Sequence, residues 1–245
     1  MVSNAESFLP SRETHGFCFG GEQFLVVDTA ALWWARERAL IVADMHLEKG
    51  SWFAERGQLL PPYDSAETIK KLSQLVDSFG AQSVYCLGDN FHDDAGVSRL
   101  SEECSQQLDI LSKRTKIHWI IGNHDSGIDA PTDGEIHWEV KIRELALRHI
   151  AEKDSILFEL SGHYHPKARV RINGRVLSRP CFALDDQKLI LPAFGAYAGG
   201  LDICDDVVVD LFPQGVTALI HTKSRLCKFP YAVTAGWQMP VGTVA

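Results

Sequence analysis

Short runs of consecutive apolar residues recur through the first half of the chain, separated by segments in which apolar residues are spaced differently. A short run that is apolar on both faces is typical of a strand buried within a parallel sheet. The predicted strands are residues 39–43, 83–87 and 116–121. Between them, apolar residues recur at three- and four-residue intervals, as on the buried face of a helix. This strand–helix–strand–helix–strand order predicts a parallel sheet covered by helices.

Capping residues and apolar spacing place the two predicted helices. Asp64 and Glu67 have the spacing of a capping box at the start of the first helix, and Gly80 is a suitable C-terminal stop. The second helix is predicted from its apolar positions, which are Leu100, Cys104, Leu108 and Leu111.

The second half of the chain has the pattern of short strands joined by turns. Asn173-Gly174 and Asp185-Asp186 predict turns within segments 167–179 and 181–191. A further strand pair is predicted at residues 207–212 and 216–222. We therefore expect a strand-rich, mostly antiparallel second half. An α/β fold of four layers, α/β/β/α, with two stacked mixed sheets flanked by helices, accommodates both halves.

Length and charge limit the remaining possibilities. The 245 residues contain no internal repeat or Ser/Gly-rich linker, so we expect a single domain over residues 1–245. Within it, the strand-rich half covers residues 166–222, and the segment after residue 229 stays unassigned. The 24 basic and 32 acidic residues give a net charge of −8, which argues against a protein that coats DNA by counterion release. A local basic patch, or positive charge supplied by metal ions, remains compatible with this composition.

The chain shows no feature of export or membrane insertion. No apolar run approaches the ~18 residues of a membrane helix, and the N-terminus lacks the pattern of a signal peptide. The 6 cysteines form no CxxC pair, so a disulfide framework is not expected. We expect a cytoplasmic protein with no membrane partner.

Metal-ligand residue types follow each of the three early strands. Because ligands gather at the carboxyl ends of parallel strands, we expect these side chains to meet at one edge of the sheet. A single Asp-x-His triplet is weak evidence, but an ordered series of such blocks over residues 44–165 is specific. In chain order the blocks are DxH at 44–46, GDxxH at 88–92, GNHD at 122–125, His149, and GHxH at 162–165.

This series resembles the signature of the calcineurin-like metallophosphoesterases, every block of which is present. The resemblance implies a phosphoesterase with two divalent metal ions and the calcineurin-like phosphoesterase fold. The implied ligands of one ion are Asp44, His46, Asp89 and His165. Those of the second ion are Asp89, which is shared, Asn123, His149 and His163.

The resemblance also assigns His124 as the catalytic histidine, with Asp125 beside it to orient the ring. His149 is followed by Ile150-Ala151 where the family pattern has Glu-Pro, so His137 stays an alternative ligand. The histidines outside the blocks are expected to be structural, and these are His15, His118, His137 and His221.

Metal chemistry agrees with the implied ligands. A mixed set of imidazole, carboxylate and amide groups suits Mn²⁺, Fe or Zn²⁺ rather than Ca²⁺ or Mg²⁺. Two ions ~3.5–4 Å apart need a bridging carboxylate, and Asp89 is the natural one. A bridging hydroxide would attack phosphorus while His124 assists the leaving oxygen.

Stretches outside these blocks resemble a narrower group, the bacterial ligase-associated DNA-damage-response phosphoesterases (PdeM-like). The resembling stretches include residues 31–34, 40–50, 60–63, 179–182 and 191–201. This resemblance implies a Mn²⁺-dependent phosphodiesterase or endonuclease that associates with a DNA ligase and a helicase.

Several residues near the blocks are candidates for substrate binding. His92 either touches substrate or orients Asp89. Arg56 and Tyr63 follow the first block, where they either bind phosphate or lie on the surface.

A basic segment follows the last block. Lys167, Arg169 and Arg171 share one face of a predicted strand, with Arg175 and Arg179 nearby. This segment either steers a nucleic-acid backbone toward the metals or is a solvated face.

The function that the sequence favours is hydrolysis of phosphodiester bonds in DNA. One alternative is a phosphodiesterase or pyrophosphohydrolase that acts on small nucleotides. An open basic groove at the metal edge would favour DNA, and a closed pocket would favour a nucleotide. A second alternative, a catalytically inactive scaffold, is disfavoured because every ligand type is kept.

Overall fold

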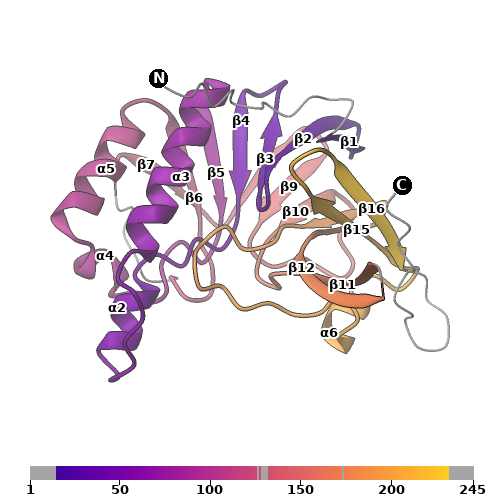
Figure 1. The fold of residues 1–245 in the computed structure, drawn as a ribbon. Coiled ribbons are helices and arrows are strands. Elements are labelled where there is room, and N and C mark those ends of the chain that lie inside the picture. The colour runs from indigo at the N-terminus through magenta and orange to yellow at the C-terminus, as the bar shows by residue number, and fades with distance from the viewer. Residues whose placement is uncertain (1–14, 126, 128–131, 173, 232–245) are drawn as a thin grey trace, which may run out of the picture.

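The computed structural model describes residues 15–125, 127, 132–172 and 174–231, and two mixed sheets lie face to face within them (Figure 1). The first sheet has the strand order β1-β2-β3-β4-β5-β6-β7. Strands β1 to β4 are antiparallel, and β4 to β7 are parallel, as predicted for the three early strands. The strands are β1 (Gly16–Phe19), β2 (Glu22–Asp28), β3 (Ala31–Trp34), β4 (Ala39–Val42), β5 (Ser83–Leu87), β6 (Lys116–Ile120) and β7 (Gly134–His137).

The second sheet has the order β16-β15-β13-β14-β10-β9-β8. Most of its pairs are antiparallel, as expected, but β10 is parallel to both of its neighbours, β9 and β14. Its strands are β8 (Glu139–Ile142), β9 (Leu145–Arg148), β10 (Phe158–Ser161), β13 (Phe182–Leu184), β14 (Lys188–Ile190), β15 (Val216–His221) and β16 (Leu226–Tyr231).

Two long helices cover the outer face of the first sheet (Figure 1). Helices α3 (Asp64–Phe79) and α5 (Glu102–Ser112) bury Leu72 and Leu108 against strand residues such as Trp119. The short helices α2 (Lys49–Ala54) and α4 (Gly96–Arg99) lie in the connections that follow β4 and β5. In the described part of the chain, no helix combines the length and apolar character needed to cross a bilayer.

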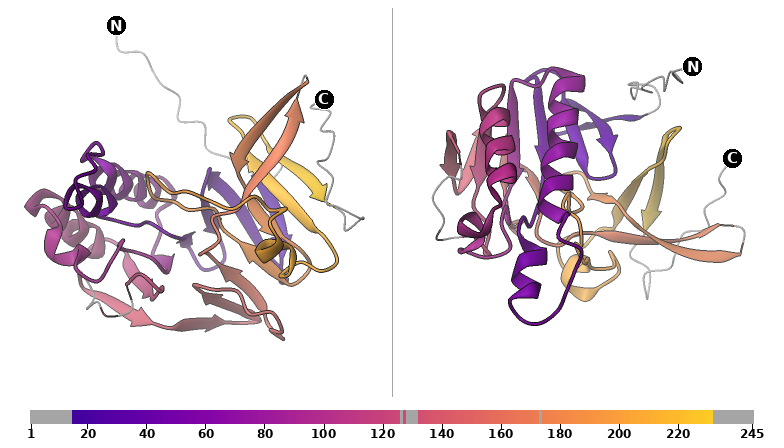
Figure 2. Two further views of the ribbon diagram at one scale, coloured as in Figure 1. Left: turned by 90° about the horizontal axis from the view of Figure 1, so that it is seen from below. Right: turned by 60° about the vertical axis from the view of Figure 1, so that its left-hand side comes forward.

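The core between the sheets consists of large apolar side chains from both inner faces, including the fully buried Trp34, Ile41 and Phe182. The outer face of the second sheet is covered differently from the first. There the antiparallel ribbon of β11 (Lys167–Ile172) and β12 (Arg175–Pro180), together with the short α6 (Asp206–Val209), provides the cover (Figure 2). The predicted pair of stacked mixed sheets is confirmed, and within the described residues its fourth layer is this ribbon and single helical turn.

Two predicted helix boundaries are wrong in informative ways. Asp64 does not cap α3; its Oδ2 accepts a hydrogen bond from the backbone N–H of Gly50 (2.8 Å), which ties α3 to α2. Leu100 lies before α5, which begins after Ser101, whose hydroxyl accepts the N–H of Cys104. The predicted stop at Gly80 is confirmed by its left-handed φ of 58°.

The strand predicted at residues 207–212 is also wrong, because this segment begins with α6. Strand β15 has neighbours on both sides, β13 and β16, so no edge remains for it to pair with this segment. Val208 and Phe212 bury their apolar side chains on the outer face of the second sheet instead.

Candidate metal centre

The loops that follow β4 and β10 bring Asp44, His46 and His165 together. The Nε2 atoms of His46 and His165 lie 3.2 Å apart, and His165 Nε2 lies 3.4 Å from Asp44 Oδ1. The Asp44 carboxylate accepts the backbone N–H of His163 at 3.0 and 3.1 Å, which fixes its orientation. A Cβ on Gly162 would lie 2.5 Å from Asp44 Oδ2, so this close approach requires glycine. These three side chains present one ligand atom each to a common point.

A second group contains Asp89, Asn123, His149 and His163. His149 Nε2 lies 3.3 Å from Asp89 Oδ1, 3.0 Å from Asn123 Oδ1 and 3.1 Å from His163 Nδ1. The Nδ1–H of His149 donates to the carbonyl oxygen of Leu87 (3.0 Å), and this bond turns Nε2 toward the group. The geometry therefore favours His149 over His137, which lies in a different cluster.

Asp89 lies between the two groups. Its Oδ1 belongs to the second group, whereas its Oδ2 lies 3.8 Å from His46 Nε2 in the first. The backbone N–H of His124 donates to Asp89 Oδ1 at 3.0 Å and holds the carboxylate in this orientation. Asp89 thus has the position expected of a carboxylate that bridges two ions.

The charges in this region call for a cation. Asp44 and Asp89 are 0% and 2% exposed, and within the described residues the ion pairs found for them are with histidines alone. Burial, followed by the nearby His165 and Lys49, lowers the pKa of His46 to about 2, and burial also lowers the pKa of His163. Because burial disfavours the charged forms of His46 and His163, these imidazoles give the two buried carboxylates little compensating charge, which is costly unless a metal binds there. The donor set fits two divalent ions.

The backbone is strained at several of the candidate ligands. A positive φ in a residue with a side chain is uncommon and concentrates at functional sites. Five of the ligand residues have such values: Asp44 (53°), His46 (44°), Asp89 (45°), His163 (70°) and His165 (46°).

His124 lies beside Asp89 with its ring partly exposed to solvent. Its Nδ1–H donates to the carbonyl oxygen of His92 (3.0 Å), which leaves Nε2 facing the site, 3.9 Å from Asp89 Oδ2. The rings of His92 and His124 stack with centroids 5.3 Å apart. His92 therefore contacts His124 through both its carbonyl oxygen and its ring, and its expected contact with substrate or with Asp89 stays a prediction.

The expected role of Asp125 is corrected by its contacts. Its carboxylate is fully buried and accepts backbone N–H groups from Gly122 (2.7 Å), Asn90 (2.6 Å) and Phe91 (3.4 Å). Asp125 is 0% exposed and faces the protein interior, whereas the side chain of His124 is 43% exposed and lies beside Asp89. Asp125 ties together the two loops that carry Asp89 and Asn123.

The residues predicted after the first block lie on the surface. The guanidinium of Arg56 stacks over the ring of Trp52 at 3.6 Å and donates to the Trp52 carbonyl oxygen. Tyr63 is 62% exposed at the start of α3. Neither the Arg56 nor the Tyr63 side chain belongs to the two groups of candidate ligands.

The basic face predicted on the strand after the last block is present. Lys167, Arg169 and Arg171 alternate along β11 with the buried Ala168 and Val170. Arg169 forms an ion pair with Asp202, so part of the positive charge is compensated. Arg175 and Arg179 of β12 are paired with Ile172 and Ala168 of β11. Because paired residues point to the same face, these two arginines lie on the face opposite to that of Lys167, Arg169 and Arg171.

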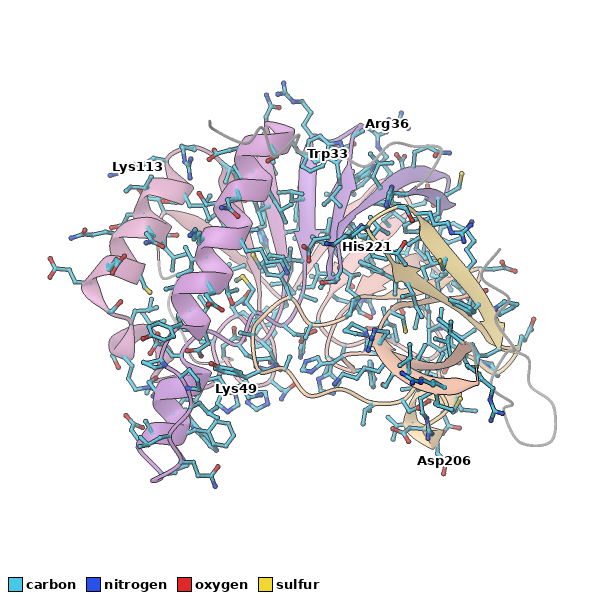
Figure 3. The ribbon with its side chains drawn as sticks, viewed as in Figure 1. Trp33, Arg36, Lys49, Lys113, Asp206 and His221 are labelled. Atoms are coloured by element: carbon cyan, nitrogen blue, oxygen red, sulfur yellow. The ribbon has the colours of Figure 1, made fainter. Side chains whose placement is uncertain are left out.

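Lys49 is a site residue that the sequence did not identify. It begins α2, is half-buried, and lies among the ligand loops at the edge of the sheets (Figure 3). Burial lowers the pKa of Lys49, while the negative charges of Asp64 and Asp89 oppose that shift. In the sequence, only the position of Lys49 three residues after His46 could have indicated that it lies near the site.

Two clefts reach the ligand groups from different sides. One is lined by His165, Lys167 and Lys71, together with the loop at residues 192–199. The other is lined by Asn123, His149 and Trp138, the last of which is 71% exposed. The sites are therefore approached along the surface from both sides.

Comparison with known proteins identifies the family. Residues 37–192 match the calcineurin-like phosphoesterase family, and no curated protein matches the chain significantly. The crystal structure of nuclease MPE from Pseudomonas putida is similar over 87% of this chain and 100% of that one, with 24% identity and a TM-score of 0.69. YfcE, a phosphoesterase from E. coli, covers 78% of this chain and 97% of its own, with 13% identity and a TM-score of 0.40. The family match, which includes all the loops that carry candidate ligands, shows that this chain belongs to the calcineurin-like phosphoesterases and is a metal-dependent phosphoesterase.

Proposed function

We propose that this protein hydrolyses phosphodiester bonds in DNA with two divalent ions, Mn²⁺ in the first place. The observation that carries the proposal is the position of Asp89 between two groups of candidate ligands. Its Oδ1 faces one group and its Oδ2 faces the other, and His124 lies beside it. This arrangement suits an in-line displacement at phosphorus, in which both the attacking oxygen and the leaving oxygen must be stabilised.

Each ligand group would hold one ion. Asp44, His46 and His165 would bind the first, Asn123, His149 and His163 the second, and Asp89 both. When bound, the ions would activate a water molecule between them and neutralise the phosphoryl oxygens.

His124 would act on the leaving oxygen. Because its Nδ1 is held by the His92 carbonyl, its Nε2 is the atom available to donate a hydrogen bond or a proton. Its side chain is 43% exposed, so a substrate oxygen can approach it. Lys49, whose charge acts on His46, His92 and Asp89, would attract the phosphate charge.

An extended substrate is favoured over a small nucleotide by the surroundings of the site. The two clefts continue away from the ligand groups, one toward Lys167 and the other toward the exposed ring of Trp138. Exposed aromatic rings beside a backbone-binding site are a common platform for unstacked bases. The protein of similar fold from Pseudomonas putida is a nuclease, which supports a nucleic-acid substrate. The association with a DNA ligase and a helicase rests on the sequence resemblance alone.

The test compares a DNA substrate with a small chromogenic diester. We expect the double variant Lys167→Gln/Arg171→Gln to raise KM for DNA and to flatten its salt dependence by about 0.7–0.9 of a log–log unit per lost phosphate contact. Arg169 is left in place because Asp202 already pairs with it. Arg175→Gln, which removes a charge from the opposite face of the same ribbon, is the matched control and should change neither quantity.

The outcomes separate the alternatives. Turnover of the small diester needs only the metal groups and His124, so it should hardly change in the double variant. A nucleotide enzyme would show no selective defect on DNA. Equal losses on both substrates would mean that the substitutions damaged the site itself.

A further inference from the structure

A third cluster of ligand-type side chains lies outside the metal centre, on the parallel pair β6–β7. His118 lies on β6, and Glu135 and His137 lie on β7, with His118 directly opposite Glu135 in the register. Their nearest ligand atoms form a triangle: His118 Nδ1 is 3.2 Å from His137 Nε2 and 3.5 Å from Glu135 Oε2, and His137 Nε2 is 3.4 Å from Glu135 Oε2.

The triangle has the dimensions of one face of a tetrahedral zinc site. With Zn–N and Zn–O bonds of about 2.0–2.2 Å, adjacent ligand atoms of a tetrahedron lie about 3.3–3.5 Å apart. A hydrogen bond between the rings of His118 and His137 accounts for the 3.2 Å edge only. The other two edges are longer than good N–H···O hydrogen bonds, whose usual range is about 2.7–3.2 Å. A shared ion accounts for all three edges.

The ligand atoms are held in place by neighbours. The ring of His118 stacks on Tyr85 with centroids 4.5 Å apart and planes 11° from parallel. The Nζ of Lys116 pairs with Glu135 Oε1 at 2.7 Å, which leaves Oε2 turned toward the two imidazoles. The cluster therefore needs little rearrangement to accept an ion.

Charge and access also suit a cation. Glu135 supplies a carboxylate oxygen to the triangle, and the two imidazole nitrogens are ligand types that Zn²⁺ commonly takes. The side chain of His118 is 10% exposed, but those of His137 and Glu135 are 28% and 51% exposed. An ion can thus reach the triangle from solvent, and a water molecule can complete its coordination.

We propose that His118, Glu135 and His137 form a third metal site, which binds one Zn²⁺ through Nδ1, Oε2 and Nε2 with water as the fourth ligand. The ion would link the edge strand β7 to β6, the strand that leads directly into Asn123 and His124. Its role would be to hold the sheet edge beneath the catalytic loop.

The experiment counts zinc in the full-length protein. Protein stripped with a chelator is dialysed to equilibrium against Zn²⁺, and bound zinc per chain is measured by elemental analysis. We expect wild type to bind one ion more than His137→Gln, and Glu135→Gln to match His137→Gln. The Zn²⁺-dependent rise in Tm should be smaller in both variants. The binuclear centre is unaltered in all three proteins, so the difference does not depend on its occupancy.

Two variants and one control keep the result decisive. His137 lies at the end of β7 and the side chain of Glu135 is 51% exposed, so neither substitution is expected to prevent folding. His221→Gln removes a histidine elsewhere and should keep the full count. Equal zinc counts in wild type and both site variants would overturn the proposal, as would the same loss of zinc in the His221→Gln control.

Discussion

Replacing Asp125 by asparagine tests whether this residue holds the ligand loops together or orients His124. Asparagine keeps the shape of the side chain but presents one acceptor and one donor in place of two acceptors. In the native site both carboxylate oxygens accept backbone amides, from Gly122 on one side and Asn90 on the other. One of those amides must then face an NH₂ group.

The expected cost follows from these contacts. A buried amide left without an acceptor costs about 1–3 kcal/mol, and the retained bond weakens by about 1 kcal/mol when its acceptor loses its charge. Removal of a buried charge offsets part of this loss, because burial and the nearby Asp89 already disfavour the ionised form and raise the pKa of Asp125. We expect the free energy of unfolding to fall by about 2 kcal/mol.

The assay is denaturant unfolding in the presence of a chelator, so that metal binding does not contribute to the difference. Asp94→Asn is the matched control, because Asp94 also accepts one backbone amide, that of Gly127 at 3.0 Å, but at an exposed site. Its free energy of unfolding should change by less than about 0.5 kcal/mol. The Asp125 variant should also bind both ions more weakly, since it connects the loops of Asp89 and Asn123.

The opposite result would refute this reasoning. If Asp125→Asn unfolded like wild type and kept its metals while kcat fell, the residue would act on the His124 ring, as the sequence alone implied.

Three further substitutions test the metal centre. Asp89→Ala should lose both ions and all activity, and two ions still bound per chain would contradict its bridging position. His124→Ala should keep its metals and fold but lose ~10²–10⁴ in kcat; normal turnover, or a metal-free protein, would disprove its role. Gly88→Ala places a Cβ 2.3 Å from His149 Nδ1 on a backbone with a φ of +77°, so it should displace His149 and lower the metal content by about one ion. Elemental analysis showing full occupancy would refute that expectation.

The central strands, and the meeting of candidate ligands at one edge of the sheet, could be predicted because both follow from simple rules. Strands β4, β5 and β6 are apolar on both faces, and their carboxyl ends necessarily meet at one edge. This is why Asp89 and Asn123, which follow β5 and β6, were expected to lie together, and both lie beside His149 Nε2.

The errors arose where the outcome depended on partners distant in sequence. The valine-rich segment at 207–212 reads as a strand, but its place beside β15 is taken by β16. The contact between His118 and His137 could not be predicted either, because their 19-residue separation gives no sign that β6 and β7 pair side by side. Asp125 was misassigned because adjacency in sequence suggested contact with His124.

The left-handed backbone at five ligand residues has a consequence for how this protein can change under selection. Each such residue costs about 1 kcal/mol or more, so together they amount to on the order of 5 kcal/mol, comparable to the whole stability of many domains. Substitutions that relieve this strain would raise the stability of the protein and at the same time remove its candidate ligands. Selection for heat resistance alone would therefore drive the chain toward an inert fold, and a library screened for thermostability should enrich glycine or asparagine at these positions unless catalysis is selected at the same time.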